Sequence, residues 1–314
     1  MIRKTVPCNL CGSIEGKFLF NAKDRLHGCE GTFTYVKCKM CGLVYMNPQI
    51  LPEDAGKFYP NDYGPHKATK NRQQNRLTME TQLKKRLFGA FICNKLTSQS
   101  RLLDVGCGNG KFLYEIKSFV GCNVYGVDIS EKAAKIAKRD YGLDVFTGTI
   151  VEAPFPSDYF NMITAWQYLE HVHNPLEVLQ KFYHLLKADG VCIISTPNFN
   201  SFNSKVFKDR WYALDCPRHL HIYTPKTIDK FLEKAGFLLT GISYDKSSKN
   251  LLGSLQYHFY GDNYTAEYRN RIKRSLIVKA VLSPLTRVFA LLKKSDNIII
   301  SARKVTRNEF ADNK

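Results

Sequence analysis

The sequence has no apolar run of the length needed to cross a lipid bilayer, which is about 18 residues or more. Its first residues, MIRKTVPCNLCG, also lack the apolar segment of a secretory signal peptide. These two absences argue against a membrane-spanning protein and against export. We therefore expect a cytoplasmic protein in a reducing compartment, where its ten cysteines do not form a disulfide framework.

Acidic residues are few relative to basic ones. The 314 residues include 28 Asp and Glu against 46 Lys and Arg, which gives a formal net charge of +18. This surplus favours an anionic partner such as nucleic acid, an acidic membrane surface or a phosphorylated substrate, and a solvated basic surface is the alternative. Hydrophobic residues make up 44% of the chain, enough for a sizeable core, and the length allows two domains.

Four cysteines form two Cys-x-x-Cys-Gly segments near the start of the chain. CNLCG contributes Cys8 and Cys11, and CKMCG contributes Cys38 and Cys41. Each segment presents two thiolates from one tight turn, which is typical of a structural zinc ribbon, whereas redox dithiols or free thiols are the alternative. We predict a ribbon over residues 1–50 whose Zn²⁺ supplies folding energy. It either binds nucleic acid or packs against the next domain.

Residues 51–100 are interpreted as a linker. Its aromatic loop FYPNDYGPH contains Tyr59 and Tyr63, which could cover a ligand but are expected to pack. Residues 67–95 combine many basic residues with apolar residues at helical spacing. This pattern predicts a basic amphipathic helix that packs on the following domain.

From Arg101 onward, short apolar runs alternate with helical patterns. We expect strands at RLLDV, NVYGVDIS, LDVFTG, FNMITAW and GVCIIST, and helices after the first two. Continuous apolar runs predict an α/β fold with a parallel sheet covered on both faces. In such a fold, ligands bind beyond the carboxyl ends of the strands.

The first strand leads into the glycine-rich turn of RLLDVGCGNGKF. Gly106, Gly108 and Gly110 allow positive φ angles and a close approach of the backbone to a ligand. Asp104 precedes the turn, and its carboxylate disfavours a pyrophosphate but suits a sulfonium ligand with an amino-acid tail. Asp128 ends the second strand, where an acidic residue binds ribose hydroxyls.

These segments, together with TGTI, FPSDYFNMI and LEHVHNP, resemble the class I S-adenosylmethionine-dependent methyltransferases over residues 101–304. The resemblance implies a Rossmann-like, seven-stranded sheet of order 3-2-1-4-5-7-6 whose last strand, DNIIISARK, is antiparallel. It also implies S-adenosylmethionine as cofactor. The residues implied to bind it are Asp104, Gly106, Gly108, Gly110, Asp128, Ile129, Thr149, Ile150, Ala165 and Trp166.

The resemblance also assigns roles within that set. The glycines hold the amino-acid end of the cofactor, Asp128 its ribose, and Thr149 and Ile150 lie beside the adenine. The chain departs from the family at Thr149, where many members have an acidic residue. Glu152 is a candidate substitute.

Three histidines are candidates for the base that removes a proton from a hydroxyl acceptor. His171 follows the fourth strand, and His219 and His221 follow the fifth in CPRHLHIYTP, where an extended backbone points both the same way. Roles in capping and loop architecture are the alternatives. A second metal site made of His219, His221 and either His171 or Glu170 is a further alternative.

Residues 197–223 form an aromatic and basic loop that is predicted to roof the substrate site. Before the last strand, residues 247–295 form a helical insert, in which Pro284 is expected to kink or split a helix. Its basic amphipathic pattern suits a membrane interface, and a cap packed on the active site or a dimer face is the alternative. Residues 305–314 are expected to form a flexible tail. The predicted apolar face of the insert comprises Ile277, Val281, Leu285, Val288 and Leu292.

The overall plan, including CGLVYMNP and PRHLHIYTP, resembles methyltransferases of polysaccharide and surface-glycan biosynthesis. Our first hypothesis is O-methylation of a sugar or lipid-linked glycan intermediate, with peripheral contact at the inner face of the membrane. An RNA methyltransferase with zinc-ribbon recognition is an alternative. Another is a quinone-type O- or C-methyltransferase, because such enzymes share LEHV. The intact glycine turn argues against a non-catalytic binding module, and the oligomeric state is left open.

Overall fold

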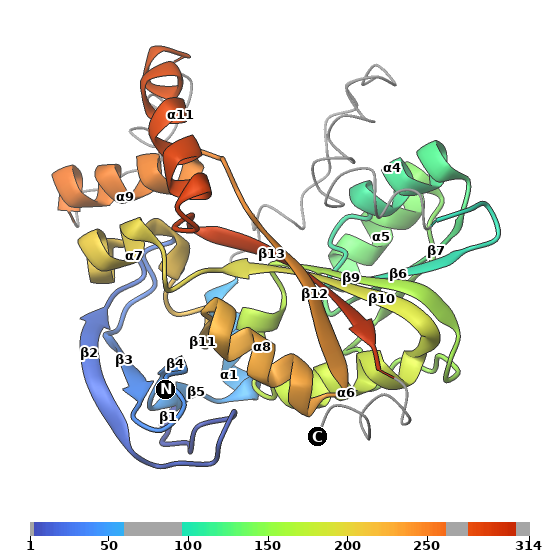
Figure 1. Cartoon of the computed structure of the whole chain (residues 1–314), viewed down its shortest axis with the longest axis horizontal. Coiled ribbons are helices and arrows are strands. Elements are labelled where there is room, and N and C mark those ends of the chain that lie inside the picture. The colour runs from blue at the N-terminus through green and yellow to red at the C-terminus, as the bar shows by residue number, and fades with distance from the viewer. Residues whose placement is uncertain (1–2, 60–95, 262–275, 306–314) are drawn as a thin grey trace.

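A seven-stranded sheet forms the centre of the computed structural model, which describes residues 3–59, 96–261 and 276–305 (Figure 1). Its strand order is β12-β13-β10-β9-β6-β7-β8, and β13 is antiparallel to both of its neighbours. The predicted α/β class, strand order and antiparallel last strand are confirmed. The strands are β6 Arg101–Val105, β7 Asn123–Asp128, β8 Val145–Thr147, β9 Phe160–Trp166, β10 Leu186–Pro197, β12 Phe237–Tyr244 and β13 Asn297–Lys304.

Helices cover both faces of this sheet, as its apolar strands require. α4 (Lys111–Val120) and α5 (Glu131–Tyr141) pack on the face that contains Leu102. α6 (Pro175–Leu185) and α8 (Pro225–Lys234) pack on the opposite face. Since β6, β7 and β9 run in parallel, the loops that follow them meet at one edge of the sheet.

The N-terminal residues form a second, smaller sheet of order β11-β4-β3-β2. One of its strands, β11, comes from the predicted roof loop much later in the chain. It pairs with β4 through His221 and Tyr45. The N-terminal module therefore packs against the methyltransferase-like region, which was one of the two predicted arrangements. The elements of this part are β1 Arg3–Lys4, β2 Gly16–Ala22, β3 Phe33–Cys38, β4 Val44–Met46, β5 Gln49–Ile50, α1 Pro52–Ala55, η1 Gly56–Phe58 and β11 His221–Ile222.

Several predictions lie outside the described residues. These are Tyr63, the basic helix predicted over residues 67–95, and the predicted tail apart from Val305. Among the residues that the structure does describe, none of the helices combines the length and the apolar composition needed to cross a bilayer.

The predicted roof contains three short helices after β10, and the described part of the insert contains two longer ones, α9 and α11. α11 runs through Pro284 as one helix, so of the two expected effects of this residue the split is wrong, and the kink stays a prediction. Val281, Leu285, Val288 and Leu292 are exposed, so the alternative in which this face packs on the active site is also wrong. The elements are α7 Phe202–Phe207, η4 Lys208–Arg210, η5 Tyr212–Leu214, α9 Lys249–Tyr260 and α11 Leu276–Leu291.

Candidate functional site

The glycine turn lies between the ends of β6 and β7. Gly106 and Gly108 have φ angles of 71° and 55°, a region that residues with a side chain adopt only with strain. The Gly108 N–H donates to Asp128 Oδ2 at 2.7 Å, and the Ser130 N–H donates to Oδ1 at 2.9 Å. Asp128 is therefore fixed at the sheet edge, directly beside the turn.

The glycines of this turn have different surroundings. A Cβ on Gly106 would lie 2.7 Å from the ring of Tyr168, which covers the turn. A Cβ on Gly110 would instead lie 2.9 Å from Ala137 Cβ, where α4 and α5 pack together. The absence of a side chain at Gly110 is thus required by helix packing, and its role toward a cofactor stays a prediction.

Asp104 lies in β6 and is separated from Gly106, the first residue of the turn, by Val105. Its side chain is buried, and the Thr164 hydroxyl of β9 donates to Asp104 Oδ1 at 2.6 Å. This hydrogen bond ties the ends of two adjacent strands together. The carboxylate is therefore held in a fixed position close to the glycine turn.

The remaining residues implied by the resemblance lie on β9 or on the loops after β7 and β8. Ile129 is exposed, whereas Ile150 and Ala165 are buried. Trp166 packs edge-on against Phe112, with 5.4 Å between ring centroids.

Glu152, the candidate acidic substitute for Thr149, is hydrogen-bonded to it. The backbone N–H and the hydroxyl of Thr149 donate to Glu152 Oε2 at 2.9 and 2.7 Å, and these hydrogen bonds lower the pKa of Glu152. A carboxylate therefore occupies the neighbourhood in which the family places its acid.

A second cluster lies beyond the end of β9, in η3 (Leu169–His171) and the roof loop. The rings of His171 and His219 contact each other edge to face, 4.6 Å between centroids. His219 Nδ1 lies 3.0 Å from the Ala213 carbonyl oxygen, so Nδ1 carries the proton and donates it. Neutral His219 therefore has its lone pair on Nε2, which lies 4.0 Å from Glu170 Oε1.

Burial determines the charges in this cluster. It lowers the pKa of His219 to about 4, and together with the neighbouring His219 it lowers the pKa of His171 to about 3. Burial also raises the pKa of Glu170 to about 8, and neither of its carboxyl oxygens has a hydrogen-bond partner among the described residues. At neutral pH the cluster thus contains two neutral imidazoles and a largely protonated carboxyl group.

Tyr59, from the N-terminal part of the chain, completes the cluster. Its hydroxyl lies 2.9 Å from His171 Nδ1, and the Arg218 carbonyl oxygen lies 3.2 Å from the same atom. From the sequence, Tyr59 could cover a ligand or pack, and packing was the prediction. Its contact with His171 could not be read from the sequence.

A buried ion pair links the roof loop to the N-terminal module. The Arg218 guanidinium donates to both carboxylate oxygens of Asp24, each at 2.8 Å, and to Asp215 Oδ1 at 2.7 Å. Burial would raise the pKa of Asp215, but the adjacent Arg218 outweighs it and lowers this pKa to about 2. Asp215 also lies 3.8 Å from His219 Nε2. Arg218 therefore connects the N-terminal module, through Asp24, with the histidine cluster, through Asp215.

His221 does not belong to this cluster. Its Nε2 lies 3.0 Å from Asn9 Oδ1 and 3.4 Å from Gln49 Nε2, inside the N-terminal module. The expectation that His219 and His221 point the same way is wrong, because only His221 lies in the strand that joins β4. Among the described residues of the cluster, Glu170, His171 and His219 lie close enough together to share a metal ion, and His221 is not part of that group.

Two non-glycine residues with left-handed backbones border the site. Gln167, directly after β9, has a φ of 52°, and Asp215 has a φ of 38°. Such strain is found where the surrounding structure imposes it, commonly near functional sites. Tyr168, which lies over Gly106, follows Gln167. No feature of the sequence distinguished Gln167 or Tyr168.

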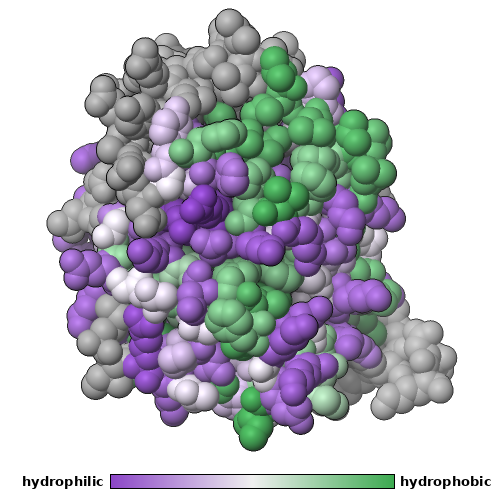
Figure 2. Space-filling model, turned by 90° about the vertical axis from the view of Figure 1, so that its left-hand side faces the viewer, coloured by the Kyte–Doolittle hydropathy of each residue, from purple (hydrophilic) through white to green (hydrophobic). Residues whose placement is uncertain are grey.

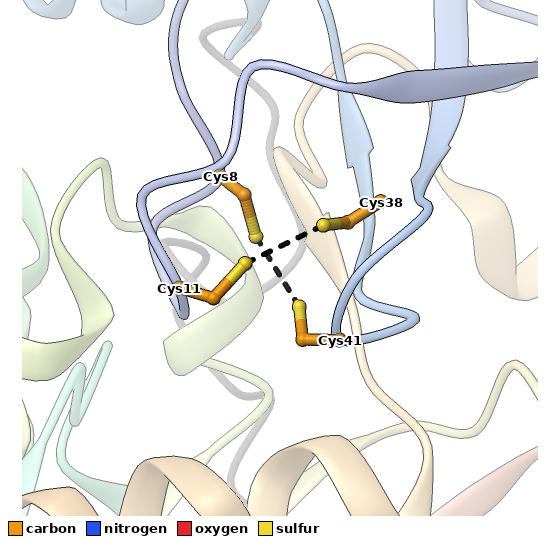
Figure 3. Close-up of side chains that lie close together, drawn as sticks. All are labelled: Cys8, Cys11, Cys38 and Cys41. Atoms are coloured by element: carbon orange, nitrogen blue, oxygen red, sulfur yellow. Dashed lines mark hydrogen bonds between the residues drawn. The ribbon is translucent and has the colours of Figure 1, made fainter.

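The four N-terminal cysteines come together (Figure 3). The Sγ atoms of Cys8 and Cys41 are 3.4 Å apart, those of Cys11 and Cys38 are 3.5 Å apart, and all four lie within 4.8 Å of one another. Tetrahedral zinc–sulfur bonds of about 2.3 Å require S···S separations of about 3.8 Å. The spacing of these thiols therefore fits a shared metal ion and exceeds the length of a disulfide bond.

Comparison with known proteins identifies the fold and the activity. A family model described as "Methyltransferase domain" matches residues 72–240, more than half of the chain. The chain belongs to this family. It is a class I S-adenosylmethionine-dependent methyltransferase, as the resemblance implied.

Two curated relatives of the methyltransferase are both named "Ubiquinone biosynthesis O-methyltransferase". One, from Nitrosomonas europaea, is 31% identical over 160 residues, which cover 46% of this chain and 66% of the relative. The other, from Thiobacillus denitrificans, is 31% identical over 165 residues, which cover 48% of this chain and 70% of the relative. The match to the first thus spans just under two thirds of that protein.

Two solved structures share the fold of the methyltransferase. A protein from Galdieria sulphuraria, provisionally described as a sarcosine dimethylglycine methyltransferase, aligns with a TM-score of 0.50 and 16% identity, over 73% of this chain and 85% of its own. The cyclase SpnF aligns with a TM-score of 0.50 and 19% identity, over 76% of this chain and 85% of its own. At this identity they show the fold alone, because one fold hosts several reactions.

Proposed function

We propose that the methyltransferase methylates a hydroxyl group on a small, quinone-type aromatic ring. The curated relatives share this substrate class in name, and they support it better than the sugar hypothesis, for which the comparisons offer no support. The structural observation that carries the proposal is the neutral imidazole pair of His171 and His219 at the carboxyl edge of the sheet.

Residues at the same edge would hold the methyl donor. We assign the backbone of Gly106 and Gly108 to its amino-acid end, with Asp104 nearby, and Asp128 to its ribose, because Asp128 lies beside the turn that the glycines open. S-adenosylmethionine supplies an activated methyl group when it is bound. The remaining task of the protein is to align the acceptor oxygen and remove its proton.

The pKa of the base indicates which acceptors it can serve. A proton moves readily only when the pKa values of base and acceptor are not far apart. With a lowered pKa, His219 is a weak base, so it suits a phenolic hydroxyl, with a pKa of about 10, better than a more weakly acidic sugar hydroxyl. Nε2 of His219 is the atom that accepts the proton, since Nδ1 is bound to Ala213.

The experiment compares acceptors with the purified full-length chain and S-adenosylmethionine. A catechol with a short prenyl chain should yield a methyl ether detectable by mass spectrometry, whereas a nucleotide sugar and a transcribed ribosomal RNA should not. Methylation of the sugar or the RNA without methylation of the catechol would overturn the proposal.

We further propose that Cys8, Cys11, Cys38 and Cys41 hold a structural Zn²⁺. Support comes from the close approach of the four sulfur atoms, which zinc would bind as thiolates. Elemental analysis should find about one zinc per chain, and absence of zinc from protein purified without chelators would contradict the proposal.

A further inference from the structure

Three helices leave the sheet at the edge that bears the candidate site. α7 follows β10, α9 follows β12, and α11 precedes β13. Their junctions lie together, because Pro197 pairs with Asn297 and Tyr244 pairs with Ile298. The glycine turn and the histidine cluster follow strands that run parallel to β10, so they lie at this same edge. Figure 1 shows α7, α9 and α11 grouped on one side of the molecule.

Direct contacts join the three helices into one unit. The ring of Phe202 on α7 stacks on Phe289 of α11, with 4.7 Å between centroids. The Thr286 hydroxyl donates to the Lys246 carbonyl oxygen at 2.9 Å, which ties α11 to the segment before α9. Phe207 of α7 contacts His258 of α9 edge-on. These contacts bury the inner side of α11, whereas the described apolar residues on its other side are exposed.

The outer side of this unit is apolar. On α11, exposed residues recur at helical spacing, while Thr286 and Phe289 on the inner side are buried. Figure 2 shows apolar side chains gathered in the upper part of the face that carries these helices. Single exposed apolar residues are ordinary, but a contiguous group marks an interaction site. The exposed members are Phe202, Val206, Phe259, Tyr260, Val281, Leu285, Val288, Leu291 and Leu292.

The same surface is positively charged. α9 and α11 contain no Asp or Glu, and Asp209 beside α7 is paired with Arg25 at 2.9 Å. Burial and the positive charges of Lys37 and Lys294 lower the pKa of Lys205, which shows how closely the cations are spaced. The exposed basic residues of this surface are Lys205, Lys208, Lys246, Lys249, Arg287 and Lys293.

We propose that the outer surface of α7, α9 and α11 docks onto an anionic lipid bilayer. The apolar side chains enter the interface, and the surrounding lysines and arginines contact headgroup phosphates. Charge distinguishes this occupant from a second copy of the chain, because two such surfaces would face each other with like charges. Docking through this surface does not depend on which acceptor the enzyme methylates.

The test is co-sedimentation of the full-length protein with vesicles of phosphatidylglycerol and phosphatidylethanolamine, compared with phosphatidylcholine vesicles. We expect binding to the anionic vesicles that weakens with added salt. The variant Leu291→Glu should bind them about tenfold more weakly or worse, because an apolar side chain of this size contributes about that factor. The matched control Ile14→Glu changes an equally exposed residue of the N-terminal module, 85% against 80%, and should bind as the wild type does.

Binding of S-adenosylmethionine, measured by calorimetry, should be the same in both variants, which separates membrane docking from catalysis. Equal sedimentation of Leu291→Glu and wild-type protein would overturn the proposal. So would a dimer in solution that the Leu291→Glu variant dissociates while neither protein binds vesicles, since the surface would then serve a second copy.

Discussion

The N-terminal module and the C-terminal insert are both additions to the same sheet, yet they are attached in opposite ways. The module is bound to the catalytic region by β4–β11 pairing and by the buried Arg218–Asp24 pair. The Tyr35 hydroxyl donates to the carbonyl oxygen of His219 at 2.8 Å. The insert is attached through α9 and through one side of α11, and the apolar side of α11 remains exposed.

The two added segments therefore serve different purposes in the molecule. Buried polar groups need hydrogen-bond partners in a fixed geometry. The module supplies such partners, so it lies in a fixed position against the histidine cluster. An exposed apolar face adds little to the stability of the fold and is available to a partner. Changes that remove the contacts between the module and the catalytic region should therefore damage the fold and catalysis together, whereas changes on the exposed face of the insert should leave both intact.

The largest effect is expected when the cysteine cluster is dismantled. In Cys8→Ser/Cys38→Ser, the module loses one proposed ligand from each of its two segments, and the proposed Zn²⁺, which would contribute to its folding energy, should no longer bind. We expect catalytic turnover to fall by more than about a hundredfold, because the strand that pairs with β11 is lost. Turnover and zinc content are the measurements. The control is Cys122→Ser, a buried cysteine outside the cluster, and wild-type turnover in the zinc-free variant would show that the module is dispensable.

The next effect is on stability. Arg218→Met leaves the buried carboxylates of Asp24 and Asp215 without their shared cation, which costs about 3–5 kcal/mol of unfolding free energy. Urea denaturation measures this loss. Arg139→Ala removes an exposed ion pair with Asp140 and should leave the midpoint unchanged. Similar midpoints for both variants would mean that the module is not anchored through Arg218.

Removal of the proposed base should affect turnover alone. His219→Ala should lower kcat by about 10²–10⁴-fold, the contribution of a general base, with S-adenosylmethionine affinity unchanged. His221→Ala is the comparison, since His221 lies in the module and outside the cluster. If His221→Ala reduced kcat as much as His219→Ala while the fold was intact, the assignment of the base would be wrong.

Stability should also depend on pH. The pKa values of His171, His219 and His221 are lowered to about 3, 4 and 3, so the unfolded chain binds protons that the folded protein excludes. The unfolding free energy should therefore fall as pH drops from about 6.5 toward 4, by about 1.4 kcal/mol per pH unit for each histidine, and the raised pKa of Glu170 offsets the contribution of one histidine above about pH 4.5. Urea titrations across this range measure the slope. A flat profile would show that these histidines are not buried in neutral form.

The sequence predicted the sheet well because its apolar runs and glycine turns are local signals. The placement of Asp128 followed from the local pattern of the second strand, whereas the strand order followed from the family resemblance. The histidine cluster was only half predictable: His171 and His219 were named, but Tyr59 joins them across 112 residues of sequence. His221 was misplaced because an alternating pattern shows which residues share a strand direction and not which strand they will pair with.

The smallest effect on stability is expected for substitutions on the exposed face of the insert. This prediction tests the contrast between the insert and the N-terminal module most directly. Leu285→Gln and Val288→Gln replace exposed apolar residues of α11 that contact no core. The unfolding free energy should change by no more than about 0.5 kcal/mol, as for ordinary surface substitutions. Phe289→Ala, on the buried inner side of the same helix, should cost about 3 kcal/mol. If the outer substitutions were as destabilising as Phe289→Ala, the apolar face would be part of the folded core, and the contrast between insert and module would disappear.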